Sequence, residues 1–255
     1  MLKVFANQLS RLIPRFLKKI IFRLTGRCIP FGDESVLFRS SISHLCECKK
    51  DLFFIQIGAN DGISFDDFHP VVREHGLSGL VVEPLSEYFE QLKTTYLGMT
   101  SVKPIHIALH ATDKVVEMYH VDQACQGIPE FAKGIGSFDV NHHHCSGVPD
   151  EMIIKETVNC VTWRELLLIH DVDHVDIVQI DTEGYDYEIL KMINADDHCI
   201  SIIRCEHGVG SGVMSRQELR EVYNYFRSQG FTVVIGESDL TAVRKHISDA
   251  VASKE

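Results

Sequence analysis

Three carboxylates stand directly after apolar runs, where the end of a strand would leave them at one edge of a sheet. Asp181 and Glu183 follow the run Val175–Ile180, and Glu206 follows the run Ile200–Cys205. Because neighbouring parallel strands end at the same edge, we expect these side chains to converge. Carboxylates in such a place can accept a proton from a hydroxyl group or coordinate a divalent metal ion. The structural alternatives are a helix N-cap for Asp181 and a favourable interaction of Glu183 with a helix dipole.

Histidines near the middle of the chain are further candidates for proton transfer. The residues His142–His144 are consecutive, and imidazole titrates close to neutral pH. Adjacent side chains cannot all face one pocket, so we assign the role of base to His143; the alternative is a solvated loop. Neither this histidine run nor the Cys-Glu-Cys run at 46–48 has a partner at the spacing of a zinc site. We therefore predict no structural metal, and a divalent metal at the carboxylates remains an unsupported alternative.

A turn of small residues follows the apolar run Leu52–Ile57. The sequence there is Gly58-Ala59-Asn60-Asp61-Gly62. In doubly wound sheets, ligands bind above the first turn from strand to helix. Glycine lets the backbone turn sharply and approach a ligand closely. The alternative is a tight connection that binds nothing.

The second apolar run ends at Glu83, which Pro84 follows. An acid about 20 residues beyond such a turn accepts hydrogen bonds from the hydroxyl groups of a ribose. The turn lacks the middle glycine of the dinucleotide fingerprint, and Asp61 would repel a phosphate. A nucleoside without phosphates fits both facts, and the common one is S-adenosylmethionine, whose ammonium group Asp61 could hold.

Apolar runs and helical patterns alternate from residue 51 onward. This alternation predicts an α/β fold with a doubly wound, mostly parallel sheet that helices cover on both faces. Residues 122–160 are irregular, which is typical of a functional lid or a disordered segment. We expect strands at 52–57, 80–82, 102–109, 115–121, 175–180, 200–205, 231–235 and 240–244, and helices at 65–75, 86–96, 163–170, 185–193 and 216–229.

Four segments in order resemble the FkbM-type S-adenosylmethionine-dependent methyltransferases: IGANDG (57–62), VVEP (81–84), VQIDTEGYDYEIL (178–190) and IIRCEHG (202–208). The resemblance runs from about Phe53 to Val243. It implies a class I methyltransferase fold, which is Rossmann-like and has seven strands, the last of them antiparallel.

The same resemblance implies roles for individual residues. Gly58, Ala59, Asn60 and Asp61 would line the methionine end of the cofactor, Glu83 would bind its ribose, and Ala108 would lie near its adenine. The family turn usually begins with Asp where this chain has Gln56, and Gln carries no charge to pair with the cofactor's ammonium group.

Charge divides the 255-residue chain into two parts. Residues 1–32 hold seven Lys and Arg and no acid, so residues 33–255 hold the other 18 basic residues against all 36 acids. We predict a basic N-terminal segment at 1–32 and a methyltransferase domain at 33–255. The acidic domain disfavours nucleic acid as a partner.

The N-terminal segment carries an apolar stripe at helical spacing between Leu9 and Leu24, which predicts an amphipathic helix. Two interpretations stay open: peripheral contact of residues 1–27 with an anionic membrane, or docking on the domain or on another subunit. The eight cysteines need no disulfide framework in a chain of this length, and we expect a reducing, cytoplasmic location.

We expect an O-methyltransferase that acts on a hydroxyl group of a small molecule or a glycan. The alternatives are an NAD-dependent oxidoreductase, which the turn disfavours, and a nucleoside-binding scaffold without catalysis. Such a scaffold would have no use for the converging acids Asp181 and Glu206.

Overall fold

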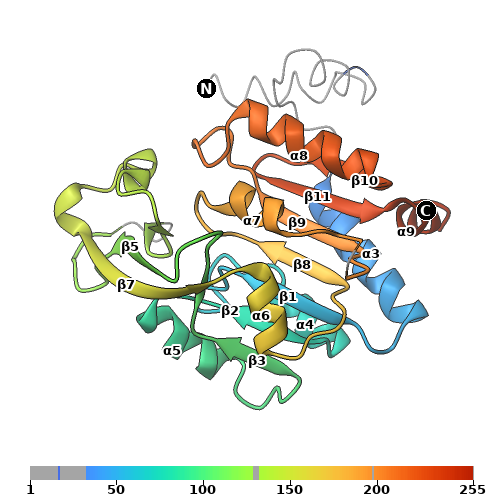
Figure 1. Ribbon diagram of the computed structural model, residues 1–255, viewed down its shortest axis with the longest axis horizontal. Helices are drawn as coiled ribbons and strands as arrows, with labels where there is room; N and C mark the ends of the chain where they lie inside the picture. The colour runs from blue at the N-terminus through green and yellow to red at the C-terminus, as the bar shows by residue number, and fades with distance from the viewer. Residues whose placement is uncertain (1–16, 18–32, 129–131, 197, 255) are drawn as a thin grey trace.

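Apolar and β-branched strands form a seven-stranded sheet at the centre of the molecule (Figure 1). The computed structural model describes residue 17 and residues 33–128, 132–196 and 198–254. In spatial order the strands are β10 (Phe231–Ile235), β11 (Asp239–Arg244), β9 (Ile202–Glu206), β8 (Ile177–Ile180), β1 (Phe53–Ile57), β2 (Ser78–Val82) and β3 (Val102–Ile105).

Only β11 runs against its neighbours in this sheet: it pairs antiparallel with both β9 and β10, and the other pairs are parallel. The α/β, doubly wound fold of a class I methyltransferase is therefore confirmed. The order also places β1 beside both β2 and β8. The turn after β1 therefore lies between the ends of those two strands.

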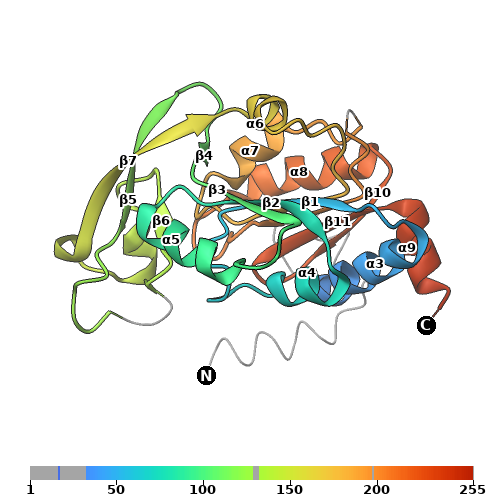
Figure 2. The ribbon, with the colours of Figure 1, turned by 90° about the horizontal axis from the view of Figure 1, so that it is seen from below.

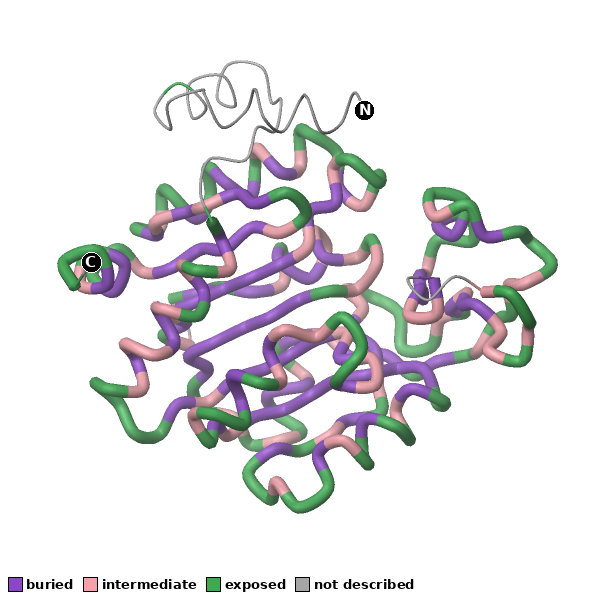
Figure 3. Tube along the Cα trace, turned by 180° about the vertical axis from the view of Figure 1, so that it is seen from behind, coloured by how far each residue is buried: buried purple, intermediate pink, exposed green. Residues whose placement is uncertain are grey.

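Helices cover both faces of the sheet (Figure 2). One face packs against α6 (Trp163–Ile169), α7 (Asp186–Met192) and α8 (Arg216–Ser228). The other packs against α3 (Glu34–Cys48), α4 (His69–His75), α5 (Ser86–Thr95) and α9 (Lys245–Ala252). The strands between these layers are buried, and the exposed parts of the trace are mainly the outer turns and loops (Figure 3).

A smaller sheet projects to one side of the main one (Figure 1). Its order is β4 (Ala108–Leu109), β7 (Ile153–Val161), β5 (Val115–Val121) and β6 (Gly136–Ser137). Two short 3-10 helices, η2 (His142–Ser146) and η3 (Asp150–Met152), lie between β6 and β7. The end of the stretch expected to be irregular is therefore regular, because seven residues of β7 pair with β5, while most of the described residues between β5 and β7 form turns, bends and these short helices.

Two expectations about elements were wrong. The strand expected at 102–109 is split, since β3 ends at Ile105 and β4 belongs to the smaller sheet. The helix expected from residue 65 begins at His69, because two aspartates hold the preceding residues in turns. Helices α3 and α9 were not expected at all. The helix predicted between Leu9 and Leu24 lies almost entirely outside the described residues.

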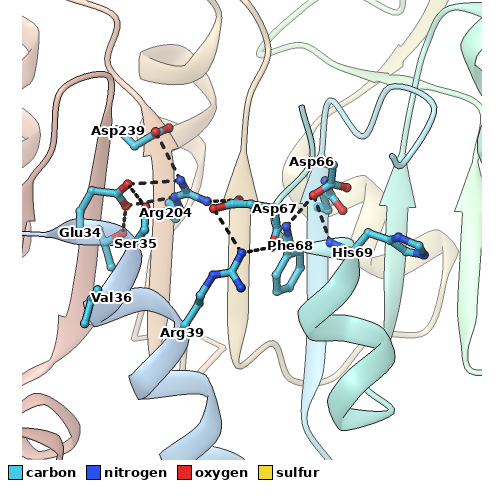
Figure 4. A network of polar contacts seen from close by, with 12 residues as sticks. Glu34, Ser35, Val36, Arg39, Asp66, Asp67, Phe68, His69, Arg204 and Asp239 are labelled. Carbon is cyan, nitrogen blue, oxygen red and sulfur yellow. Dashed lines mark hydrogen bonds and ion pairs between the residues drawn. The ribbon is translucent and has the colours of Figure 1, made fainter. Parts of the chain in front are cut away.

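One buried arginine joins four parts of the fold (Figure 4). Arg204 on β9 donates to Glu34 at the start of α3 through Nε (3.1 Å) and Nη2 (3.2 Å). It also contacts Asp67, in the loop before α4, and Asp239 on β11. The loop between β1 and α4 is therefore tied to the main sheet. No helix among the described residues is long and apolar enough to cross a membrane.

Candidate active site

The turn after β1 is shaped by the strands on both sides of it. The backbone N–H groups of Gly58 and Ala59 both donate to the carbonyl of Val82, at 3.0 Å. A Cβ added to Gly58 would lie 1.7 Å from the carbonyl oxygen of Asp181, and its φ of +76° also favours glycine. Glycine is therefore required here by the end of β8, whether or not a ligand approaches the turn.

Glu83 links this turn to the end of β2. Its carboxylate is buried and accepts backbone hydrogen bonds from Asn60 and Leu85, each at 2.9 Å. Burial raises the pKa of Glu83 to about 7, although the two hydrogen bonds act in the opposite direction. The bond to Asn60 holds that residue in its left-handed conformation, with φ of +49°.

A cavity opens above these turns at the carboxyl ends of β1, β2 and β8. Six of the seven residues predicted to bind the cofactor line it: Gly58, Ala59, Asn60, Glu83, Pro84 and Ala108. The side chains of Phe138 and Tyr185 line the same cavity, with ring centroids 5.1 Å apart and planes nearly perpendicular. The cavity therefore includes residues of the segment that carries the smaller sheet.

Asp61 is the seventh residue predicted to bind the cofactor, and its side chain accepts hydrogen bonds from the backbone of the turn that contains it. Its Oδ1 accepts backbone hydrogen bonds from Ile63 at 2.8 Å and Ser64 at 2.7 Å, and it is not among the residues that line the cavity. Asp66 lines the cavity instead, and its Oδ2 accepts a hydrogen bond of 3.0 Å from Gln56 Nε2. A negative charge thus lies beside the glutamine that occupies the first position of the turn.

Two glutamines in the cavity wall have an oxygen without a partner. The Oε1 atoms of Gln56 and Gln179 are buried and accept no hydrogen bond, and both residues line the cavity. A buried acceptor without a donor costs free energy, which a ligand with N–H or O–H groups would recover. Sequence reasoning missed Asp66 and Gln179. The signal for Gln179 was a polar residue within an otherwise apolar strand.

The predicted acids gather at the end of β8 and β9. Asp181 and Glu183 line the cavity, and Glu206 lies at the end of the adjacent strand with its Oε2 buried and unpaired. Asp181 is surrounded by protein although its side chain is open to the cavity. Desolvation first and the charge of Glu183 second raise its pKa. Desolvation and Asp181 likewise raise the pKa of Glu206.

A further buried acid holds the turn that carries two of these carboxylates. Asp186, which sequence reasoning did not single out, accepts hydrogen bonds from the backbone N–H of Thr182 at 3.2 Å and from its hydroxyl at 2.8 Å. Glu183 occupies the left-handed region with φ of +51°, and Gly184 follows with φ of +113°. The carboxylate of Glu183 points toward His142, the first residue of η2.

His142, rather than His143, reaches the edge of the sheet where Asp181, Glu183 and Glu206 gather, which we call the acidic edge. Its Nε2 lies 2.9 Å from Oε2 of Glu183, and the hydroxyl of Ser137 donates to the carbonyl of Glu183 at 2.7 Å. The side chain of His143 contacts Asp150 instead and does not line the cavity. None of the three histidines lines the cavity, and His142 reaches it only through Glu183, so the structure does not place the predicted base His143 at the site.

A model of the methyltransferase FkbM domain matches residues 56–233, which is more than half of the chain. The chain belongs to the FkbM family of S-adenosylmethionine-dependent methyltransferases. The comparison with curated proteins found no match to this chain.

Two solved methyltransferase structures are similar to this FkbM domain. The FkbM methyltransferase of Methylobacillus flagellatus KT is 11% identical, with a TM-score of 0.46; the match covers 76% of this chain and 43% of that one. The N-terminal domain of human METTL16 in complex with SAH is 13% identical, with a TM-score of 0.42, and the match covers 90% of this chain and 80% of that one.

The cavity of this FkbM domain suits the cofactor of its family, S-adenosylmethionine. Glu83 would accept hydrogen bonds from ribose hydroxyls, and the unpaired oxygens of Gln56 and Gln179 would accept them from an ammonium group. Asp66 would supply the negative charge that Gln56 lacks. No residue that lines the cavity within the described part of the chain is a lysine or an arginine, so the ionisable side chains of the wall include four acids and neither of these bases.

Proposed function

We propose that this FkbM domain methylates a hydroxyl group on an uncharged small molecule or glycan. The observation that carries the proposal is the pair Asp181 and Glu183, which face the cavity beside the predicted cofactor residues. When bound, S-adenosylmethionine supplies an activated methyl group. The protein must then hold the acceptor oxygen in line and take its proton.

Asp181 is the proposed base. Desolvation and the charge of Glu183 raise the pKa of Asp181, and a carboxylate with a raised pKa is a stronger base once it is ionised. Glu183 is the proposed hydrogen-bond acceptor for the same hydroxyl or a neighbouring one, and its position is fixed by His142 at 2.9 Å. His142 is a positioning residue in this scheme, because it touches Glu183 and does not line the cavity.

The charge of the cavity supports an uncharged acceptor. Asp66, Glu83, Asp181 and Glu183 all line it, and no lysine or arginine among the described lining residues offers a cation to a phosphodiester. The aromatic faces of Phe138 and Tyr185 offer apolar surface to a ring of the acceptor. A small molecule or glycan with a free hydroxyl group suits this wall better than a nucleic acid does.

The test is a substitution that keeps shape and removes the base. We expect Asp181→Asn to bind S-adenosylmethionine with the affinity of the parent and to lower methyl transfer by at least ~100-fold, the scale of lost proton transfer. Labelled S-adenosylmethionine and fractionated small molecules and glycans from the host supply the acceptor. Binding is measured by calorimetry and transfer by incorporated label.

Asp173→Asn is the matched control, because Asp173 is exposed and precedes β8, at the opposite end of the same strand from Asp181. Its methyl transfer should equal that of the parent. If Asp181→Asn also turns over like the parent, Asp181 only shapes the turn and the proposed base is wrong.

A further inference from the structure

Two histidines and one aspartate converge outside the cavity of the candidate active site. Nε2 of His143 lies 2.8 Å, and Nε2 of His144 lies 2.6 Å, from the same oxygen of Asp150. The three ligand atoms all lie within 4.8 Å of one another. Among the described residues, no other three His, Cys, Asp or Glu side chains come together in this way.

The local backbone brings the three side chains together. His143 and His144 belong to η2, and Asp150 opens η3. Consecutive side chains of a 3-10 helix point about 120° apart, so they do not normally meet at one atom. Here Gly147, with φ of +69°, ends η2, and the N–H of Val148 donates back to the carbonyl of His143 at 3.2 Å. This turn returns the chain so that Asp150 lies against both rings.

Although the spacing of residues predicts no structural metal here, we propose that His143, His144 and Asp150 bind one transition-metal ion of the zinc class. Two imidazole nitrogens and one carboxylate oxygen suit zinc and its neighbours, whereas magnesium and calcium prefer oxygen ligands throughout. Bonds of about 2.0–2.1 Å place the ligand atoms of a tetrahedral zinc site about 3.3 Å apart. Each nitrogen–oxygen separation would widen by roughly half an ångström, which side-chain rotation can supply.

The exposure of the ligands allows an ion to enter. The ring of His143 is buried, which fixes one ligand, while His144 and Asp150 are exposed. These three residues also line a surface hollow together with Tyr119 and Lys155. The hollow gives room for the water that would complete the coordination of the ion.

The ion would join η2 to η3 and close the turn at 147–149. His142, the first residue of η2, precedes two of the proposed ligands, and its Nε2 contacts Glu183. The ion would thus hold in place the segment from which His142 reaches the acidic edge. Its role is structural and does not depend on the proposed methyl acceptor, because none of its ligands lines the active-site cavity.

The experiment uses the full chain, freed of metal by chelation and dialysis. Zinc is titrated by calorimetry, and cobalt absorption gives a second readout. We expect one zinc site per chain that Asp150→Asn and His144→Ala each weaken by at least ~10-fold. Both side chains are exposed, so these variants should keep the fold of the parent, which circular dichroism checks.

Two controls separate this site from unspecific binding. Glu151→Gln changes an exposed acid next to Asp150, and His246→Ala removes an exposed histidine on α9; both should bind zinc like the parent. The exposed thiol of Cys48 near His44 is a rival ligand. Zinc bound equally by the parent, Asp150→Asn and His144→Ala, or no zinc bound by the parent, would overturn the proposal.

Discussion

At the scale of single residues, several side chains serve the fold and the candidate site together. Gly58 is needed because the carbonyl of Asp181 occupies the space where a Cβ would stand. Glu83 binds two backbone N–H groups and remains available to a ribose. Asp61 shows the opposite case, because its hydrogen bonds within the turn explain it fully. A residue's type and place in a motif therefore do not reveal which way its carboxylate points.

Asp66 and Asp61 are competing candidates for the carboxylate that binds the ammonium group of S-adenosylmethionine. Asp66 lines the cavity beside Gln56, so Asp66→Asn should lower the affinity for S-adenosylmethionine by about tenfold or more, the scale of a lost charge-assisted hydrogen bond. The amide oxygen can still accept the bond from the N–H of Phe68. Calorimetry measures the change.

Asp61→Asn is the comparison and should leave that affinity within about twofold, because the amide oxygen can keep the turn bonds to Ile63 and Ser64. A large loss in Asp61→Asn, with none in Asp66→Asn, would instead assign the ammonium group to Asp61, as the sequence suggests.

At the scale of elements, the loop between β1 and α4 is fixed by charges from distant parts of the chain. Arg204 on β9 binds Asp67 in this loop and Glu34 on α3 (Figure 4). The loop includes Asp66, so the cavity wall depends on strands and helices far away in the sequence. Coulomb interactions with Asp239, Glu34 and Asp67 hold the guanidinium charged, although burial opposes them.

Removing this arginine should destabilise the fold strongly. Arg204→Met would leave the buried carboxylate of Glu34 without its cation, at a cost of roughly 3–5 kcal/mol in the free energy of unfolding. Arg39→Met is the matched control, because Arg39 contacts the same Asp67 from an exposed position and should cost less than about 1 kcal/mol. Denaturant unfolding at pH 7 measures both. Equal costs for the two variants would show that burial of the network contributes little.

At the scale of the whole molecule, the N-terminal segment 1–32 and residues 33–255 carry opposite net charges. The 18 basic residues against 36 acids in 33–255 agree with a cavity that no described lysine or arginine lines. The basic segment 1–32 contrasts with this body, and its function stays a prediction. A cytoplasmic location also stays a prediction.

Deleting residues 1–27 tests whether that segment binds membranes. If the stripe meets lipid, the full chain should sediment with anionic vesicles and the deletion variant should remain in solution, because seven basic residues and an apolar stripe are lost together. The affinity of the variant for S-adenosylmethionine should equal that of the parent. Aggregation or unfolding of the variant would show that the stripe packs against protein instead.

The sequence by itself determined the order of the main strands and helices, the family, and six of the residues that line the candidate cofactor cavity. Local sequence patterns predict these features: apolar runs predict buried strands, and small residues predict the turns at their ends. The capping boxes of α6 and α8, Thr162 with Glu165 and Ser215 with Glu218, are local in the same way. Such features need only neighbours along the chain, so a pattern can reveal them.

Only the tertiary structure decided which polar side chains meet. His142 contacts Glu183 across 41 positions of sequence, and Arg204 contacts Glu34 across 170. The smaller sheet depends on pairing between β5 and β7. The sequence pattern does not reveal this pairing, because the residues between the two strands are rich in turn-forming types. The direction of Asp61 and Asp66 follows from backbone hydrogen bonds that no spacing reveals. Contacts between distant residues depend on how the whole chain packs, so residue type and spacing alone do not determine them.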